Sequence, residues 1–317
     1  AKPDNTSDGN LQKYWTCEGE RRILHKAGAH LNQEPYNELM ATTLHRRILN
    51  TCDYVPYSLE GTGTSALSIC DVFLTDEEEY VPAFYVNQYA NAGERLTDYE
   101  RYVANCEELG VTCVKDALDR MIVCDDIIAN YDRHWRNFGL VRNVNSLVCR
   151  PAPIFDSGSS LWCNISLEEL RAGEHSFTSA QFHSSPAKQM LLVEDMGWFD
   201  GDKLEGFVDE AIEILSKNDA LAARLPYLKE ALTWRLERMI DIAEWSERGS
   251  IAPPTPLPPA KGLELGQGIG AQAAAQGHLD LRSFLCLVNV VIDLLDLVHQ
   301  HTARDARNTL AHDDGLD

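Results

Sequence analysis

Three polar residues in the middle of the chain have side chains suited to phosphate chemistry: Asp132, Asn137 and Asp156. A positioned carboxylate such as Asp132 can orient or deprotonate an attacking hydroxyl. The amide oxygen of Asn137 and the carboxylate of Asp156 can bind Mg²⁺, which bridges the phosphates of ATP during transfer. An acid, an amide and a second acid in this order are therefore typical of a phosphotransferase. The alternative interpretation is that Asp132 and Asn137 only stabilise turns, as Asp and Asn often do.

The segments around these residues predict the elements that hold them in place. Apolar residues at helical spacing predict a helix over Lys115–Ile128, directly before the first acid. Short strands are predicted at Phe138–Val141 and Ser146–Val148, and the run Pro153–Phe155 leads to the second acid. A helix, a loop and two strands with polar residues at the strand ends are typical of the catalytic core of a kinase.

Two charged residues near the start of the chain, Lys26 and Glu38, fit the same chemistry. Lys26 ends a predicted strand at 21–26 and can act as a point charge on the α- and β-phosphates. Glu38 lies in a helix predicted over 35–50, which has proline in its first turn. Taken singly, Lys26 would be a solvated lysine and Glu38 an acid favoured by the helix dipole. Because both residues occur together upstream of the 132–156 motifs, as in a kinase, Lys26 and Glu38 are predicted to form an ion pair.

The segments Asn130–Gly139 and Ala152–Leu161 resemble the HipA-type serine/threonine kinases. They read N-Y-D-R-H-W-R-N-F-G and A-P-I-F-D-S-G-S-S-L, against family patterns N-x-D-R-H-x-x-N-x-G and A-P-I-F-D-x-G-x-x-L. The CtkA-like proinflammatory branch of the family is the most similar. The resemblance implies an ATP- and Mg²⁺-dependent protein kinase with a two-lobed α+β fold. It also implies a small antiparallel β N-lobe and a mainly helical C-lobe.

The resemblance also implies a role for each matching residue. It makes Asp132 the catalytic residue and His134 a support of its loop, while Asn137 and Asp156 become the metal ligands. ATP binding is assigned to Gly9, Lys26, Glu38, Asp71 and Phe73.

Several of these assignments have simpler alternatives. Gly9 lies in a polar segment that resembles the family's phosphate-covering loop, but a frayed N-terminus explains the same residues. Ser7, in that segment, is the position matching a serine that is autophosphorylated in some relatives. Asp71 and Phe73 end a predicted strand over 65–73, where the family's hinge backbone meets adenine; an ordinary edge strand is the alternative.

Composition limits the classes of partner. The 317 residues carry a formal net charge of −21, which disfavours nucleic-acid binding because phosphate backbones need a basic surface. The nine cysteines contain no C-x-x-C pair, which favours a reducing, cytoplasmic compartment over a disulfide scaffold or zinc site. The sequence shows no signal peptide, although a secreted or host-delivered effector stays open. The apolar run 284–292 is too short and too flanked by charge to span a membrane.

The predicted organisation has four parts. Residues 1–95 form the N-lobe and hinge, and this lobe is truncated at its start if the first strand of the family's N-lobe is missing. Residues 96–249 form the helical C-lobe. Predicted helices there cover 97–110, 204–216 and 219–247. Residues 250–278 are a Pro/Gly/Ala-rich linker. Residues 279–317 hold an apolar helix and a tail of unknown role, whose alternative explanation is a sequence artefact.

Three functions remain as hypotheses. The first is a serine/threonine protein kinase that resembles HipA toxin kinases, acts on an unknown protein substrate and is restrained by an antitoxin or another regulator. The second is a lipid or small-molecule kinase of the same fold, against which the acidic charge counts because it offers no basic membrane surface. The third is a nucleotide-binding pseudokinase acting as a regulatory module, against which the intact polar motifs count.

Overall fold

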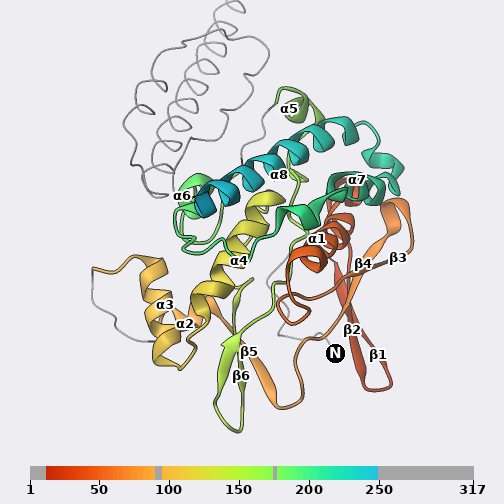
Figure 1. Cartoon of the computed structure of the whole chain (residues 1–317). Coiled ribbons are helices and arrows are strands. Elements are labelled where there is room, and N and C mark those ends of the chain that lie inside the picture. The colour runs from red at the N-terminus through yellow and green to blue at the C-terminus, as the bar shows by residue number, and fades with distance from the viewer. Residues whose placement is uncertain (1–11, 90–94, 174–176, 249–317) are drawn as a thin grey trace, which may run out of the picture.

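A computed structural model describes residues 12–89, 95–173 and 177–248 (Figure 1). The predictions for Ser7, Gly9 and the segments 250–278 and 279–317 lie outside the described residues. Within them, a sheet-containing N-terminal part is followed by a mainly helical part (Figure 1). No helix among the described residues has the length and apolar character needed to cross a membrane.

The N-terminal part is built on a four-stranded antiparallel sheet with strand order β1-β2-β4-β3. Its strands are β1 (Lys13–Glu18), β2 (Arg21–Lys26), β3 (Ser58–Glu60) and β4 (Leu67–Asp71). Helix α1 (Glu34–Ile48) packs against β3 and β4, with Pro35 in its first turn (Figure 1). Short 3-10 helices, η1 (His30–Asn32) and η2 (Gly63–Ser65), flank it.

A second, three-stranded antiparallel sheet connects this part to the helices. It contains β5 (Glu78–Pro82), β6 (Gly139–Asn143) and β7 (Cys149–Pro151), in that order. The prediction of a strand at 146–148 was wrong. The side chain of Asn143 accepts hydrogen bonds from the backbone N–H groups of Asn145 and Ser146, so the turn extends further and the strand starts at Cys149.

The helical part surrounds the buried helix α4 (Val114–Ile127). The other helices are α2 (Ala83–Val86), α3 (Asp98–Glu108), α5 (Leu167–Arg171), α6 (Pro186–Met190), η3 (Gly201–Leu204), α7 (Phe207–Ser216), η4 (Asp219–Leu221) and α8 (Leu225–Arg248). A single helical pattern over 219–247 was expected, but η4 and α8 are separate. Pro226 lies in the first turn of α8 and cannot continue a helix from the preceding residues, which explains the break.

His45 of α1 is a buried group with a marked response to acid. The residue is 2% exposed, and its ring packs on Tyr54. Burial, reinforced by the charge of Arg133, lowers the pKa of His45 to about 3. In the unfolded chain His45 binds a proton near pH 6.5, whereas in the folded chain it stays neutral down to about pH 3. Protonation therefore favours the unfolded chain, and the free energy of unfolding decreases as the pH falls from about 6.5 to about 3.

We therefore expect His45→Phe, which cannot be protonated, to reduce the acid sensitivity of folding. Relative to the wild type, its free energy of unfolding should rise by roughly 1.4 kcal/mol for each pH unit below about 6. Urea unfolding at a series of pH values measures this difference, and only its change with pH is informative, because packing alters the offset. A difference that stays constant with pH would show that His45 is not buried as a neutral ring.

Candidate active site

Lys26 and Glu38 meet at the junction of β2 and α1. Lys26 is the last residue of β2, and its Nζ donates a hydrogen bond to Glu38 Oε1 at 2.8 Å. Both side chains are buried, at 10% and 2% exposure. A buried lysine without a partner would be costly, so the strand end and the helix are fixed relative to one another by this pair.

Asp156 joins the same cluster from the other side. Its Oδ1 accepts a short hydrogen bond from Lys26 Nζ. The next residue, Ser157, donates its backbone N–H to Glu38 Oε2 at 3.0 Å. Asp156 has a φ of +57°, a left-handed conformation that is uncommon outside glycine, asparagine and aspartate. The backbone turn at Asp156 therefore places its carboxylate against the lysine while Glu38 holds the following residue.

The charges of Lys26 and Asp156 support one another, whereas burial raises the pKa of Glu38, with Lys26 opposing this shift and Asp156 adding to it. Burial alone would lower the pKa of Lys26, but the charges of Asp156 and Glu38 outweigh it and raise that pKa, so the ammonium is retained. Burial likewise acts to raise the pKa of Asp156, and the charge of Lys26 reverses this and holds it below its usual value. The cluster therefore presents a fixed cation beside an ionised carboxylate.

The residues of the cluster border a small pocket. Its lining consists of Lys26, Ala27, Glu34, Glu38, Ser68, Asp156, Gly158 and Ser159.

Asp132 and Asn137 lie at the two ends of a tight loop. Asn137 Nδ2 donates to the backbone oxygen of Asp132 at 3.0 Å, which closes the loop. His134 contributes its ring, whose Nδ1 accepts the backbone N–H of Arg136 at 3.2 Å. The structure thus places His134 where it holds the loop shape.

Asp132 and Asn137 differ in electrostatic setting. Burial raises the pKa of Asp132; His134 opposes this shift and the charge of Asp156 adds to it. A raised pKa makes this carboxylate a better proton acceptor than a solvated one. The side-chain oxygen of Asn137 is buried and has no hydrogen-bond partner among the described residues. Such an atom is costly unless a ligand or ion satisfies it.

Arg133 connects the two loops. It is fully buried, and its Nη1 donates to the backbone oxygens of Asn137, at 3.0 Å, and of Phe155, through a short bond. Its Nη2 donates to Ser157 Oγ at 3.0 Å. One guanidinium group therefore bonds both the 132–137 loop and the 155–157 segment, and it fixes the distance between the candidate base and the candidate metal ligand. No role for Arg133 was predicted from the sequence, although it is a fixed position of the motif that contains Asp132 and His134.

The predicted hinge positions differ in what their side chains do. Asp71, at the end of β4, is exposed and accepts two hydrogen bonds from Arg21 at 2.9 and 3.1 Å, so its side chain is occupied at the surface. Phe73 instead stacks on Phe155 at 5.4 Å and packs edge-on against Tyr80. The segment 72–77 connects the two sheets, so this aromatic cluster lies at the junction between them.

The sequence interpretation missed Lys13 of β1. Lys13 pairs directly with Lys26 in the antiparallel register, which places both side chains on the same face of the sheet. Its charge also lowers the pKa of Asp156, so the two groups are close enough to interact. The signal that could have revealed it is the strand alternation of 13–18 opposite 21–26, once their register is known.

The residue types present fit a magnesium ion. Among the described residues, no group of three or more His, Cys, Asp and Glu side chains is close enough to hold a metal. Mg²⁺ is usually held by one or two protein oxygens together with water and substrate phosphates. The carboxylate of Asp156 and the unsatisfied oxygen of Asn137 meet that requirement.

Comparison with known proteins is informative at the level of the fold. No protein-family model matches the sequence, and no curated protein matches it. The structure is similar to the crystal structure of a Helicobacter pylori proinflammatory kinase CtkA, with a TM-score of 0.54 and 17% sequence identity. The match covers 77% of this chain and 93% of that one. The predicted fold class is thereby confirmed: the chain has a two-lobed, kinase-like α+β fold. At this identity the likeness concerns the fold alone.

Proposed function

We propose that this chain is an ATP- and Mg²⁺-dependent phosphotransferase that acts on serine or threonine hydroxyls of proteins. The observation that carries the proposal is the convergence of Lys26, Glu38 and Asp156, with Arg133 tying Asp156 to the Asp132 loop. Four separate segments of the chain supply these residues. In a kinase-like fold, residues of these types together bind the phosphates of ATP and position them for transfer.

In this proposal each side chain has one task. Lys26, fixed by Glu38, binds the phosphates of ATP as a cation. Asn137 and Asp156 would hold Mg²⁺, which supplies charge neutralisation on the phosphates when bound. Asp132 orients the acceptor hydroxyl and takes its proton, for which the pKa raised by burial suits it. The hinge near Phe73 would receive adenine.

We extend the proposal to the class of substrate, the regulator and the location. The net charge of −21 disfavours a phosphoinositide headgroup and so favours protein over lipid. The resemblance to HipA-type kinases suggests an antitoxin or another regulator as a partner. Cytoplasmic location is proposed from the cysteines, which are free thiols throughout the described residues. We also propose that the lobes divide near residue 95 and that the kinase domain ends near residue 249.

Incubation of the protein with γ-labelled ATP and Mg²⁺ tests the proposed function. The expected result is label on serine or threonine of this chain or of proteins in an added lysate, located by phosphosite mapping. Label in a lipid extract would favour the second hypothesis. Binding of ATP with no transfer to any acceptor would favour the pseudokinase hypothesis and contradict the proposal.

Lys13 leads to a separate prediction about ATP affinity. Because it faces the same side of the sheet as Lys26, we expect Lys13→Met to raise the Kd for Mg-ATP by about fivefold, as loss of one partly solvated charge contact does. The Kd for adenosine, which has no phosphates, should not change. Lys229→Met, on the exposed surface of α8, is the matched control. Equal effects of Lys13→Met on ATP and adenosine would show that the lysine does not act on phosphate.

A further inference from the structure

A row of buried hydrogen bonds extends from the candidate active site to the segment 177–184. Its centre is Asp125, near the end of α4 and 3% exposed. The two carboxylate oxygens of Asp125 accept from Nε and Nη2 of Arg133 at 2.9 and 3.0 Å. This two-pronged pairing fixes the plane of the guanidinium as well as its position.

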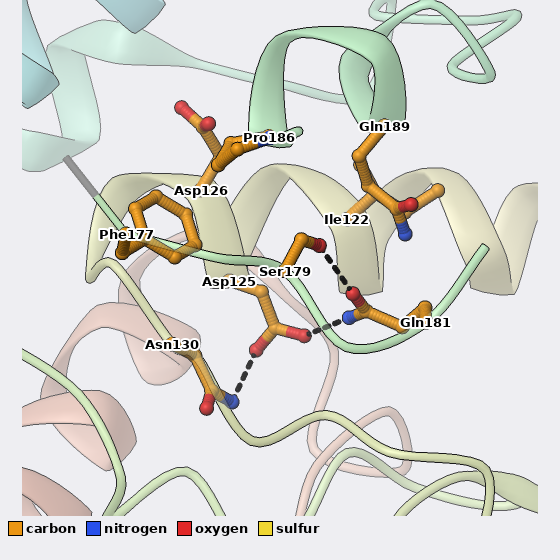
Figure 2. Close-up of a pocket in the computed structure, with 9 residues that line it drawn as sticks. All are labelled: Ile122, Asp125, Asp126, Asn130, Phe177, Ser179, Gln181, Pro186 and Gln189. Carbon is orange, nitrogen blue, oxygen red and sulfur yellow. Dashed lines mark hydrogen bonds between the residues drawn. The ribbon is translucent and has the colours of Figure 1, made fainter. Parts of the chain in front are cut away.

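Each oxygen of Asp125 also accepts one further hydrogen bond (Figure 2). Asn130 Nδ2 donates to Oδ1 at 2.8 Å, and Gln181 Nε2 donates to Oδ2 at 2.9 Å. The other end of the Gln181 amide accepts from Ser179 Oγ at 2.8 Å, so its orientation is defined. Gln181 is 8% exposed and comes from a segment 56 residues further along the chain than Asp125.

The row reaches the proposed reacting groups by two routes. Asp125 holds Arg133, and Arg133 in turn fixes the backbone positions of Asn137 and of Phe155, the residue before Asp156. Asp125 also holds Asn130, whose Oδ1 accepts the backbone N–H of Asp132 at 3.1 Å. This bond fixes the position of the candidate base. The position of one carboxylate therefore affects both loops at once.

We infer that Gln181 is a positioning residue for phosphoryl transfer, which acts through Asp125 and Arg133 and makes transfer depend on the placement of segment 177–184. The inference rests on the proposed function. Without the Gln181 amide, Asp125 Oδ2 loses one of its two donors in a buried environment. The carboxylate can then rotate, and the guanidinium of Arg133 that is paired with it can rotate as well. Small displacements of reacting groups are enough to slow a reaction strongly.

Two neutral variants separate this role from packing. Gln181→Met keeps the size of the side chain and removes its donor, and Asn105→Leu, at a buried amide away from segment 177–184, is the matched control. Asn105 of α3 is 1% exposed, and its Nδ2 donates to the backbone oxygen of Val86 at 2.8 Å. We expect Gln181→Met to lower kcat by about tenfold or more, with the KM for ATP within about threefold of the wild type, and Asn105→Leu to leave kcat nearly unchanged.

Gln181→Glu adds a test that depends on pH. The introduced carboxylate would face Asp125, and burial beside a like charge raises its pKa. Once protonated, it can donate an O–H to Asp125 as the amide does. We therefore expect the ratio of its kcat to that of the wild type to rise at least about fivefold from about pH 8 to about pH 6, whereas the ratio for Gln181→Met stays level. The charged and titratable groups around this position are Asp125, Asp126, Arg133, His183, Arg235 and Arg238.

The outcomes decide between the inference and the function it rests on. Wild-type kcat in Gln181→Met, or a flat pH ratio in Gln181→Glu, would overturn the positioning role while transfer by the wild type stands. If Gln181→Glu does not fold at the higher pH, the neutral Gln181→Met variant decides alone. If the wild type itself transfers no phosphate, the proposed function fails. Amide hydrogen exchange then tests whether Gln181 still positions the two loops. Unchanged protection of the 131–137 and 155–158 backbone in Gln181→Met would overturn that positioning role.

Discussion

Asp132→Asn should lower the rate of phosphoryl transfer by about a thousandfold and leave the Kd for Mg-ATP within about threefold of the wild type. The side chain of Asp132 is the proposed proton acceptor, but the loop around it is closed by its backbone oxygen, which the substitution keeps. Asparagine has the same shape and cannot take a proton from the hydroxyl. Labelled-phosphate transfer gives the rate, and calorimetric titration with Mg-ATP gives the affinity.

A control and a contrary outcome make this result interpretable. Asp209→Asn, at an exposed surface pair with Lys229, should leave both quantities unchanged. Loss of nucleotide binding in Asp132→Asn equal to its loss of transfer would mean that Asp132 contributes to the phosphate or metal site, and the separate role proposed for it would be wrong. Normal transfer would move the search for the base elsewhere.

Asp156→Asn should remove the magnesium dependence of ATP binding. In the wild type the Kd for ATP should fall at least about tenfold when Mg²⁺ is added, because Asp156 would hold the metal, whose charge would neutralise the phosphates. In the variant the two values should become nearly equal, and transfer should be lost. Asparagine is preferred to alanine because the φ of +57° at this position suits asparagine, so the backbone turn is kept.

Thermal melting with and without nucleotide checks that the Asp156→Asn chain is folded. Some loss of stability is expected, since Lys26 then keeps only Glu38 as a charged partner in a buried place. A folded variant with an undiminished magnesium effect would rule out Asp156 as the metal ligand and leave Asn137 and Asp132 to be tested.

Local elements and motif residues could be anticipated from the sequence, because their signals are local. Helix α1 has proline in its first turn, and α3 begins with a capping box formed by Thr97 and Glu100. The extent of the turn after β6 could not, since it depends on which backbone groups Asn143 accepts. The break before α8 had a visible cause in Pro226, yet the apolar pattern on both sides concealed it.

Long-range partners of the site were hidden for a different reason. Lys26, Glu38 and Asp156 were named from motif types, and the structure brings them together. Asp125 and Gln181 carry no such signal, and the motif that contains Arg133 does not show which groups it bonds. The role of each becomes visible only when the structure shows the two side chains buried around the Asp125 carboxylate. Roles of this kind depend on tertiary packing, which a single sequence does not display.

The central claim is that Lys26 and Asp156 form the phosphate and metal end of an ATP site, and calorimetric titration of the wild-type chain tests it most directly. ATP, ADP and adenosine would each be titrated with Mg²⁺ and with a chelator. ATP should bind most tightly, Mg²⁺ should strengthen ATP binding at least about tenfold, and adenosine should bind weakly, with the same affinity whether or not the metal is present. Absence of ATP binding at millimolar concentration, or an affinity that is the same for ATP and adenosine, would contradict it.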